Sequence, residues 1–306
     1  MIDTHSHLFV EEFAEDLPEV ICRAKEAGVT HVFMPNIDDT TTDDMLRVCR
    51  QYPDYCYPML GFHPTSVDVS SLDKVLLMKK QLVDGHPFVA IGEVGLDLYW
   101  DKTYLREQQA VLDEQIQWAL DWNLPLVIHC REAFPQLFEV LRPYKHTDLK
   151  GIFHSFTGTG EEAQEALEYD GFLLGINGVV TFKKATLPQV LQQVPMERLV
   201  LETDSPYLAP APHRGKRNES SFVERVADKF LNSLDSNTTY SVEAVPRDII
   251  FVATRNSQIL FWSNSNPCSE NLVRLLNSNR KFLLLNNSYY DIRHRDLGEL
   301  DYYALI

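Results

Sequence analysis

The chain opens with the stretch MIDTHSH, which covers residues 1–7. Side chains two positions apart in a β-strand point to the same face, so His5 and His7 would project together from the end of a first strand. Two imidazoles that face one point can bind a transition metal. The pair alone is equally compatible with two ordinary polar side chains near a mobile terminus, because short histidine motifs match by chance. A metal site therefore requires further ligands at matching positions along the chain.

Short apolar or β-branched runs recur along the sequence and alternate with amphipathic stretches. Eight runs are expected to be strands: Ile2–His5, His31–Ile37, Tyr55–Phe62, Phe88–Val94, Leu124–His129, Gly151–Phe156, Phe172–Val180 and Leu199–Thr203. Helices are expected at Asp16–Ala27, Asp43–Gln51 and Leu105–Trp122. The pattern predicts the α/β class and a TIM-like (β/α)8 barrel with parallel strands. A doubly wound open sheet is the competing fold, and it would gather its functional residues at one switch point. The barrel is favoured because residues that can bind metals or catalyse reactions lie at the C-terminal ends of many strands.

The composition limits where such a protein acts and what it binds. Hydrophobic residues make up 44% of the 306 residues, enough for a full core, and no apolar run is long enough to span a membrane. The N-terminus lacks the regions of a secretion signal, and five cysteines without a CxxC pair fit reduced thiols, so we expect a cytoplasmic protein. The net charge of -16 excludes a global basic footprint for nucleic acid, so any phosphate recognition must rest on local positive charge.

Histidines and carboxylates end five of the predicted strands, and in a barrel they would meet at one mouth. These candidate metal ligands are His5, His7, Glu93, His129, His154 and Asp204. Imidazole and carboxylate ligands without a thiolate suit zinc, manganese or magnesium ions. Six ligands exceed what one four-coordinate ion needs, so we expect two divalent ions about 3.5–4 Å apart with a bridging carboxylate. Asp204 would orient or deprotonate the attacking water.

The segment PHRGKRN, residues 212–218, concentrates positive charge in an otherwise acidic chain. Arg214, Lys216 and Arg217 follow the eighth predicted strand and should border the same mouth, where their side chains could bind phosphate. His63 and Arg131 are further candidates for phosphate binding. The alternative is a solvated surface loop, which is the usual explanation of a charge cluster by itself.

Taken together, the motifs resemble those of the TatD-type metal-dependent deoxyribonucleases of the amidohydrolase superfamily. The matching stretches are DTHSH (3–7), GFHP (61–64), IGEVGLD (91–97), IHCR (128–131), FHSFTG (153–158), LETDSPYL (201–208) and RGKRNE (214–219). The resemblance spans residues 1–262, which it predicts to be the barrel domain, and leaves residues 263–306 as a C-terminal extension of unassigned role. It implies that His5, His7, Glu93 and Asp204 bind one ion, and that Glu93, His129 and His154 bind the other.

The resemblance also implies an activity. Members of this family cleave phosphodiester bonds of DNA, often from a 3′ end, with magnesium, manganese or zinc, so we expect DNA cleavage with Asp204 and Glu93 as the catalytic carboxylates. The acidic surface fits an enzyme that grips a single-stranded end, and no obligate protein partner is evident.

Two alternatives to this activity stay open. A metal-dependent esterase or deacylase of the same fold could act on a nucleotide or aminoacyl-tRNA ester, because fold and metal do not set the substrate. A binding protein without turnover is disfavoured by the complete ligand set.

Overall fold

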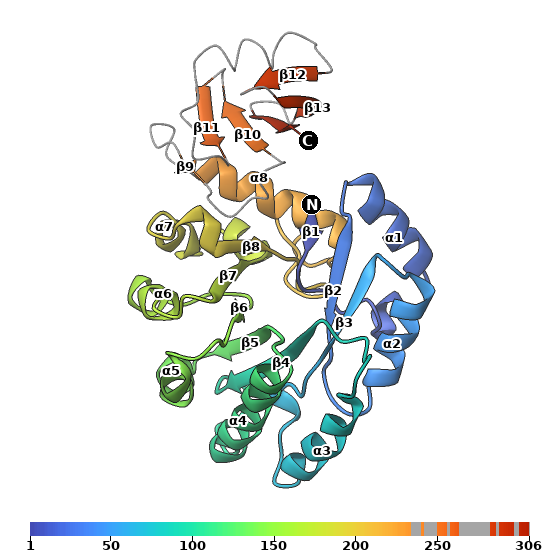
Figure 1. Cartoon of the computed structure of the whole chain (residues 1–306), viewed down its shortest axis with the longest axis vertical. Helices are drawn as coiled ribbons and strands as arrows, with labels where there is room; N and C mark the ends of the chain where they lie inside the picture. Colours follow the sequence, from blue (N-terminus) through green and yellow to red (C-terminus); the bar gives the residue numbers. More distant parts are fainter. Residues whose placement is uncertain are drawn as a thin grey trace. The chain divides into compact units, whose positions relative to one another are not determined.

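The computed structural model describes residues 1–233, 240–241, 250–255, 258–262, 282–285, 288–296 and 300–305. The chain divides into two compact units (Figure 1). The first comprises Met1–Val194 and Arg198–Leu231. The second comprises Pro195–Glu197 and the described residues from Asn232 onward.

Eight parallel strands form the sheet of the first unit, and their spatial order equals their order in the sequence. The strands are β1 (Ile2–Asp3), β2 (His31–Pro35), β3 (Cys56–Leu60), β4 (Ala90–Asp97), β5 (Leu126–Arg131), β6 (Gly151–Phe153), β7 (Phe172–Ile176) and β8 (Leu199–Leu201). All eight predicted strands are therefore present, although most are shorter than predicted. Sequential order of parallel strands is the arrangement of a TIM-like barrel, whereas a doubly wound sheet reverses its order at a switch point.

Backbone hydrogen bonds between the first and last strands nearly close the barrel. The N–H of Thr4 donates to the carbonyl of Leu201 at 3.1 Å, and the N–H of Asp204 donates to the carbonyl of His5 at 2.9 Å. A parallel bridge joins Ser6 to Ser205 one step further along both segments. The segments that carry the predicted ligands after β1 and β8 are thus held side by side.

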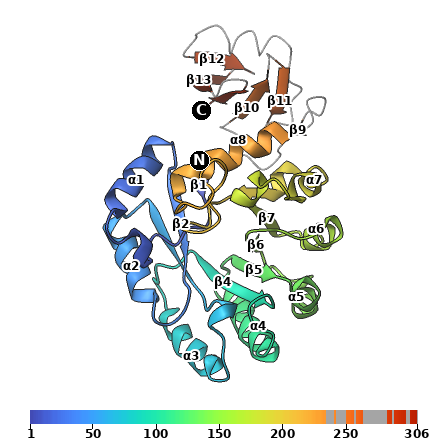
Figure 2. The same cartoon turned by 180° about the vertical axis from the view of Figure 1, so that it is seen from behind.

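Helices follow most of the strands and lie outside the sheet (Figures 1 and 2). They are α1 (Leu17–Glu26), α2 (Thr42–Gln51), α3 (Ser71–Met78), α4 (Leu105–Asp121), α5 (Phe134–Leu141), α6 (Gly160–Leu167), α7 (Leu187–Leu191) and α8 (Val223–Ser233). The three predicted helices are confirmed as α1, α2 and α4 within one or two residues at each end. Short 3-10 turns are η1 (Glu11–Phe13), η2 (Pro64–Ser66), η3 (Lys79–Gln81), η4 (Arg142–Tyr144), η5 (Gly178–Thr181), η6 (Met196–Arg198) and η7 (Ser220–Phe222).

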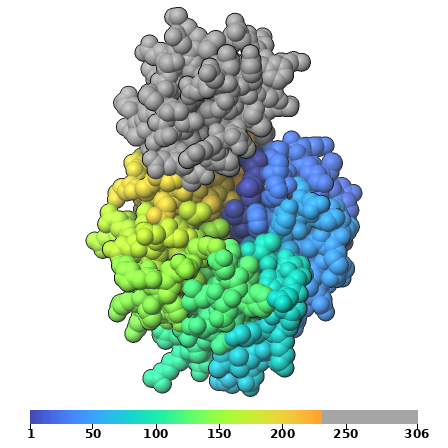
Figure 3. Space-filling model, in the orientation of Figure 1, coloured from blue at the N-terminus to red at the C-terminus, as the bar shows by residue number. Residues whose placement is uncertain are grey.

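Burial of the apolar helix faces fixes the helices against the sheet. Along α4, the longest of the described helices, Val111, Leu112, Ile116 and Trp118 are at most 2% exposed, as their helical spacing predicts. Consecutive βα repeats lie side by side around the first unit in the space-filling view (Figure 3). None of the described helices is both long and apolar enough to cross a lipid bilayer.

The second unit contains a six-stranded sheet in the order β12-β13-β14-β10-β11-β9. Its strands are β9 (Tyr240–Ser241), β10 (Ile250–Arg255), β11 (Gln258–Trp262), β12 (Phe282–Leu285), β13 (Ser288–Asp296) and β14 (Leu300–Leu305). The predicted division at residue 262 places β10 and β11 with the barrel, whereas in the structure both strands pair in this second sheet. The part of the predicted extension at residues 263–281 lies outside the described residues.

Candidate metal centre

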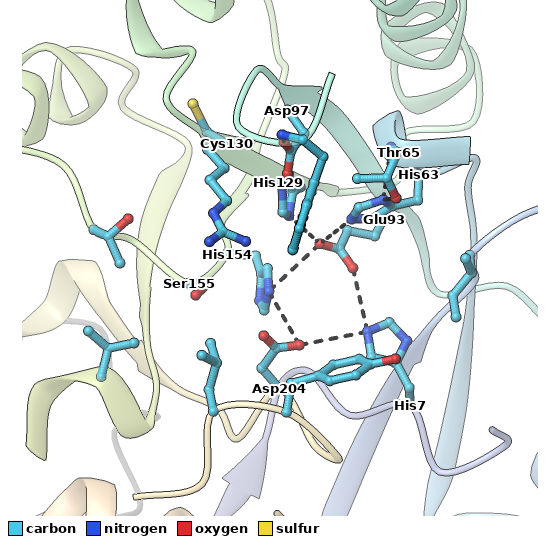
Figure 4. A pocket seen from close by; sticks show the side chains of 17 residues that line it. His7, His63, Thr65, Glu93, Asp97, His129, Cys130, His154, Ser155 and Asp204 are labelled. Atoms are coloured by element: carbon cyan, nitrogen blue, oxygen red, sulfur yellow. Dashed lines mark hydrogen bonds and ion pairs between the residues drawn. The ribbon is translucent and has the colours of Figure 1, made fainter. Parts of the chain in front are cut away.

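The six predicted metal ligands converge at the C-terminal end of the barrel. His5 and His7 follow β1, Glu93 lies in β4, and His129 lies in β5. His154 follows β6 directly, and Asp204 lies three residues after the end of β8, so five strands contribute to one cluster (Figure 4). His5, His7, Glu93 and His154 are buried, with exposed fractions of 0–4%. Charged or polar groups are buried in this number only when they pair with each other or bind an ion.

Glu93 lies between two groups of histidines and presents a different oxygen to each. Oε2 lies 3.1 Å from Nε2 of His5 and 3.6 Å from Nε2 of His7. Oε1 lies 3.0 Å from Nδ1 of His129, 3.3 Å from Nε2 of His63 and 3.7 Å from Nε2 of His154. A carboxylate placed in this way can bridge two cations, one on each oxygen.

The first group consists of His5, His7, Glu93 and Asp204, and its donor atoms fit one ion. The Nε2 atoms of His5 and His7 are 3.3 Å apart. Oδ1 of Asp204 lies 3.9 Å from the first nitrogen and 3.7 Å from the second. Ligand atoms about 2.1 Å from one tetrahedral ion are about 3.4 Å from one another. The observed separations scatter around this value, and the donor set contains the imidazole and carboxylate ligands of divalent metal sites.

The second group surrounds Oε1 of Glu93. One donor atom each from His63, Glu93 and His129 lie within 4.8 Å of one another, an arrangement that could hold a metal ion. Nε2 of His154 lies 3.7 Å from Oδ1 of Asp204 and connects the two groups. The sequence indicated His63 as a phosphate contact, but its ring lies in this group, so a metal-binding role is equally compatible with its position.

Two buried carboxylates that the sequence analysis did not single out hold histidine rings of the cluster. Oδ2 of Asp97 lies 2.9 Å from Nε2 of His129, and Oε1 of Glu202 lies 3.0 Å from Nδ1 of His154. Carboxylates behind metal-binding histidines orient the ring and raise its basicity. The alternation of strand faces could have indicated them, because Asp97 is four residues from Glu93 and Glu202 is two residues from Asp204.

Burial and neighbouring charges set the pKa values of the histidines. Burial lowers the pKa of His5 well below its usual range and that of His7 to about 4, which leaves both rings neutral with a nitrogen lone pair. Burial acts in the same direction on His129 and His154, but nearby carboxylates outweigh it. Asp97 and Glu93 raise the pKa of His129 to about 9, and Glu202, Glu93 and Asp204 raise that of His154 to about 10.

The two carboxylates of the cluster shift in opposite directions. Burial opposes ionisation of Glu93, but His63, His5 and His154 outweigh it and lower its pKa well below the usual range. Burial raises the pKa of Asp204 to about 7, and the negative charge of Glu93 adds to this effect. The cluster therefore pairs a permanent anion with a carboxylate that can exchange a proton near neutral pH.

Unusual backbone conformations lie at the strand ends that carry the site. Ser155, next to His154, and Asp204 adopt left-handed conformations with φ values of 48° and 58°. Such conformations are uncommon for residues other than glycine and cluster at functional sites. A Cβ atom at position 175 would lie only 2.5 Å from a carboxylate oxygen of Glu202. Because Gly175 has no side chain, the Glu202 carboxylate can occupy this space.

A cavity of about 650 Å³ opens beside the cluster, and its lining includes His7, His63, Glu93, His129, His154 and Asp204. This volume suits a small molecule or the end of a longer chain. Arg131, a predicted phosphate contact, also lines the cavity, and its guanidinium lies 3.6 Å from the centre of the Tyr99 ring. Arg131 is thus a cation placed on the wall of the cavity that holds the cluster.

The other predicted phosphate contacts occupy different positions. Arg214 and Lys216 are exposed and, among the described residues, are not part of the cavity lining. The Arg214 guanidinium lies 3.6 Å from the centre of the Phe182 ring. Arg217 forms a two-pronged ion pair with Asp16, with both N–O distances 2.7 Å, and also donates to the carbonyl of Glu12. The pair favours a structural role for Arg217 over phosphate binding.

Comparisons with known proteins agree with the fold and identify the family. The family model described as "TatD related DNase" matches residues 2–249. An "Uncharacterized metal-dependent hydrolase YabD" of Bacillus subtilis (strain 168) is 37% identical over 266 residues, which cover 86% of this chain and all of the relative. A "3'-5' ssDNA/RNA exonuclease TatD" of Pantoea ananatis (strain LMG 20103) is 32% identical over 81% of this chain and 96% of its own.

Solved structures show the same architecture. The crystal structure of YJJV, a TatD homologue from Escherichia coli K12, superposes with a TM-score of 0.69 at 27% identity, over 76% of this chain and 90% of that one. An uncharacterised amidohydrolase from Saccharomyces cerevisiae, at 19% identity and a TM-score of 0.66, shares the fold. The extent of the family match and the identity to full-length relatives together show that the chain belongs to the family of TatD related DNases.

Proposed function

We propose that this protein is a hydrolase that uses two divalent metal ions to cleave phosphodiester bonds at the 3′ end of single-stranded DNA. The observation that carries the proposal is the position of Glu93, whose two oxygens face separate histidine groups. Two ions in such positions can act on the attacking and leaving oxygens of a phosphoester. The relatives named as 3'-5' ssDNA/RNA exonucleases support the substrate class and the direction of cleavage.

The proposed ligand assignment follows the two groups of donor atoms. His5, His7, Glu93 and Asp204 would hold one ion, and Glu93, His129 and His154 the other, with His63 as an additional candidate. Bound ions would supply Lewis-acid polarisation of the phosphoryl group and a lowered pKa for water. Magnesium, manganese and zinc are all compatible with these donors.

The chain's own residues would divide the remaining tasks. Asp204 lines the cavity beside the proposed ions, and its carboxylate would orient a water molecule or accept its proton. Arg131 extends from the cavity wall and would bind a phosphate oxygen of the substrate. Asp97 and Glu202 would keep His129 and His154 in position.

Cleavage of labelled oligonucleotides by the purified protein tests the proposal. We expect single-stranded DNA with a 5′ label to shorten progressively from its 3′ end when magnesium or manganese is present, and to stay intact when a chelator removes the metal. Asp204→Ala should abolish cleavage, whereas Asp101→Ala, which changes an exposed acid, serves as the matched control. The proposal fails if metal-loaded protein leaves DNA intact, or if a substrate panel shows ester hydrolysis far faster than DNA cleavage.

A further inference from the structure

Exposed aromatic side chains are concentrated at the rim of the cavity. Among the described side chains of Phe, Trp and Tyr, the most exposed are those of Tyr99, Trp100 and Tyr207, with exposed fractions of 47%, 70% and 49%. Trp100 and Tyr207 line the cavity, and Tyr99 packs edge-on against Trp100 with ring centres 4.9 Å apart. Single exposed aromatic residues are ordinary on protein surfaces. Three exposed aromatic side chains at the rim of one cavity, beside a group of potential metal ligands, indicate a binding surface.

The backbone at Tyr99 and Trp100 is held beside the cluster. The backbone N–H groups of Tyr99 and Trp100 donate to Oδ1 of Asp97 at 2.9 and 3.2 Å. Oδ2 of the same carboxylate lies 2.9 Å from Nε2 of His129. One buried side chain therefore connects the loop that carries the aromatic rings to a histidine of the candidate metal site.

A cation completes this part of the rim. The Arg131 guanidinium lies 3.6 Å from the centre of the Tyr99 ring and 5.4 Å from that of Trp100, and Arg131 also lines the cavity. The rim thus presents a flat apolar surface and a fixed positive charge close together. Aromatic faces stack on unpaired bases, and guanidinium groups bind backbone phosphates.

We infer that Trp100 is a stacking platform for an unpaired nucleobase of the substrate strand, adjacent to the phosphodiester that is cleaved. The inference rests on the proposed function and deepens it, because it states which part of the substrate the cavity rim recognises. A base in a duplex is stacked between its neighbours, so a platform of this kind selects single-stranded ends. DNA and RNA bases both offer a π-face, so Trp100 does not distinguish the two sugars.

Steady-state kinetics with matched oligonucleotides test the inference. The protein variants are wild type, Trp100→Ala, Trp100→Phe and, as a surface control, Leu77→Ala, whose side chain is 61% exposed and is not part of the cavity lining. One single-stranded DNA carries ordinary bases, and a second carries abasic residues at its last three positions. An RNA strand of the same sequence forms a third arm. Thermal melting checks that every variant is folded.

Trp100→Ala should raise KM for the ordinary strand about tenfold or more, with a smaller effect on kcat, because a stacked base loses its platform. Trp100→Phe should restore most of the loss, since a smaller aromatic face remains. On the abasic strand, wild type and Trp100→Ala should have similar KM values, and RNA should follow DNA. The inference is wrong if Trp100→Ala matches Leu77→Ala, or if its loss is equally large on the abasic strand.

The same experiment separates this inference from the proposed function. If wild-type protein cleaves DNA but Trp100→Ala has an unchanged KM, the stacking platform fails and the nuclease proposal stands. If metal-loaded wild-type protein does not cleave DNA or RNA, both proposals fail together.

Discussion

The carboxylate of Asp97 lies 2.9 Å from Nε2 of His129, while Nδ1 of the same ring faces Glu93 at 3.0 Å. The imidazole is therefore held from both sides by buried acids. A ring fixed in this way can offer one defined nitrogen to an ion, since the other nitrogen is engaged by the carboxylate behind it. His154 has the corresponding relationship with Glu202.

Asp97→Asn should weaken metal binding about 10- to 100-fold, because the amide keeps the shape of the side chain but loses the charge that orients His129. The asparagine oxygen can still accept the N–H groups of Tyr99 and Trp100, so the loop should stay in place. Calorimetric titration of metal-free protein with manganese at a fixed pH measures the effect. Asp101→Asn is the control. Equal metal affinities for the two variants would show that Asp97 does not contribute to metal binding.

Metal binding should release protons. In the metal-free protein the pKa of His129 is raised to about 9 and that of His154 to about 10, so both rings are protonated at pH 7. An ion can bind their nitrogens only after these protons leave, and the carboxyl of Asp204, whose pKa is raised to about 7, is also about half protonated at pH 7. We therefore expect about two to three protons released per chain at pH 7. Apparent affinity should therefore rise as the pH increases from 6 to 9. Titrations in buffers with different ionisation enthalpies give the number, and a value near zero would contradict the predicted ligands.

Arg131→Ala should weaken binding of single-stranded DNA and make it less dependent on salt. Loss of one phosphate contact reduces the slope of log affinity against log salt concentration by about 1. Fluorescence anisotropy with a labelled oligonucleotide, in the Asp204→Asn background to prevent cleavage, measures this slope. An unchanged slope would mean that Arg131 only supports the aromatic rim.

Arg217→Ala should act on stability instead. Its ion pair with Asp16 is partly screened, because the two side chains are 30% and 34% exposed, so we expect a loss of about 0.5–1 kcal/mol in the free energy of unfolding. Asp16→Ala should cost a similar amount, and the double variant should cost less than the sum. Urea denaturation provides the free energies. A lower salt slope for DNA binding in Arg217→Ala would restore the phosphate role that its sequence position predicted.

The fold and the convergence of the six candidate ligands were predictable from the sequence, because strand periodicity and strand order determine which residues meet at the mouth of a barrel. Asp97 was missed although the alternation of strand faces could have indicated it, and the position of Arg217 was not predictable. The predicted fourth strand ended at Val94, whereas β4 continues to Asp97, so Asp97 fell outside the strand that positions it. Asp16 and Arg217 are 201 residues apart, and no local pattern identifies such a partner. The second sheet was also missed, because its strands follow no βα alternation.

A crystal structure of the manganese-loaded protein would show whether Glu93 bridges two ions. Anomalous scattering should reveal two ions about 3.5–4 Å apart. One should contact Oε2 of Glu93 together with His5 and His7, and the other should contact Oε1 together with His129 and His154. A single ion in metal-saturated protein, or two ions that Glu93 does not join, would contradict the account.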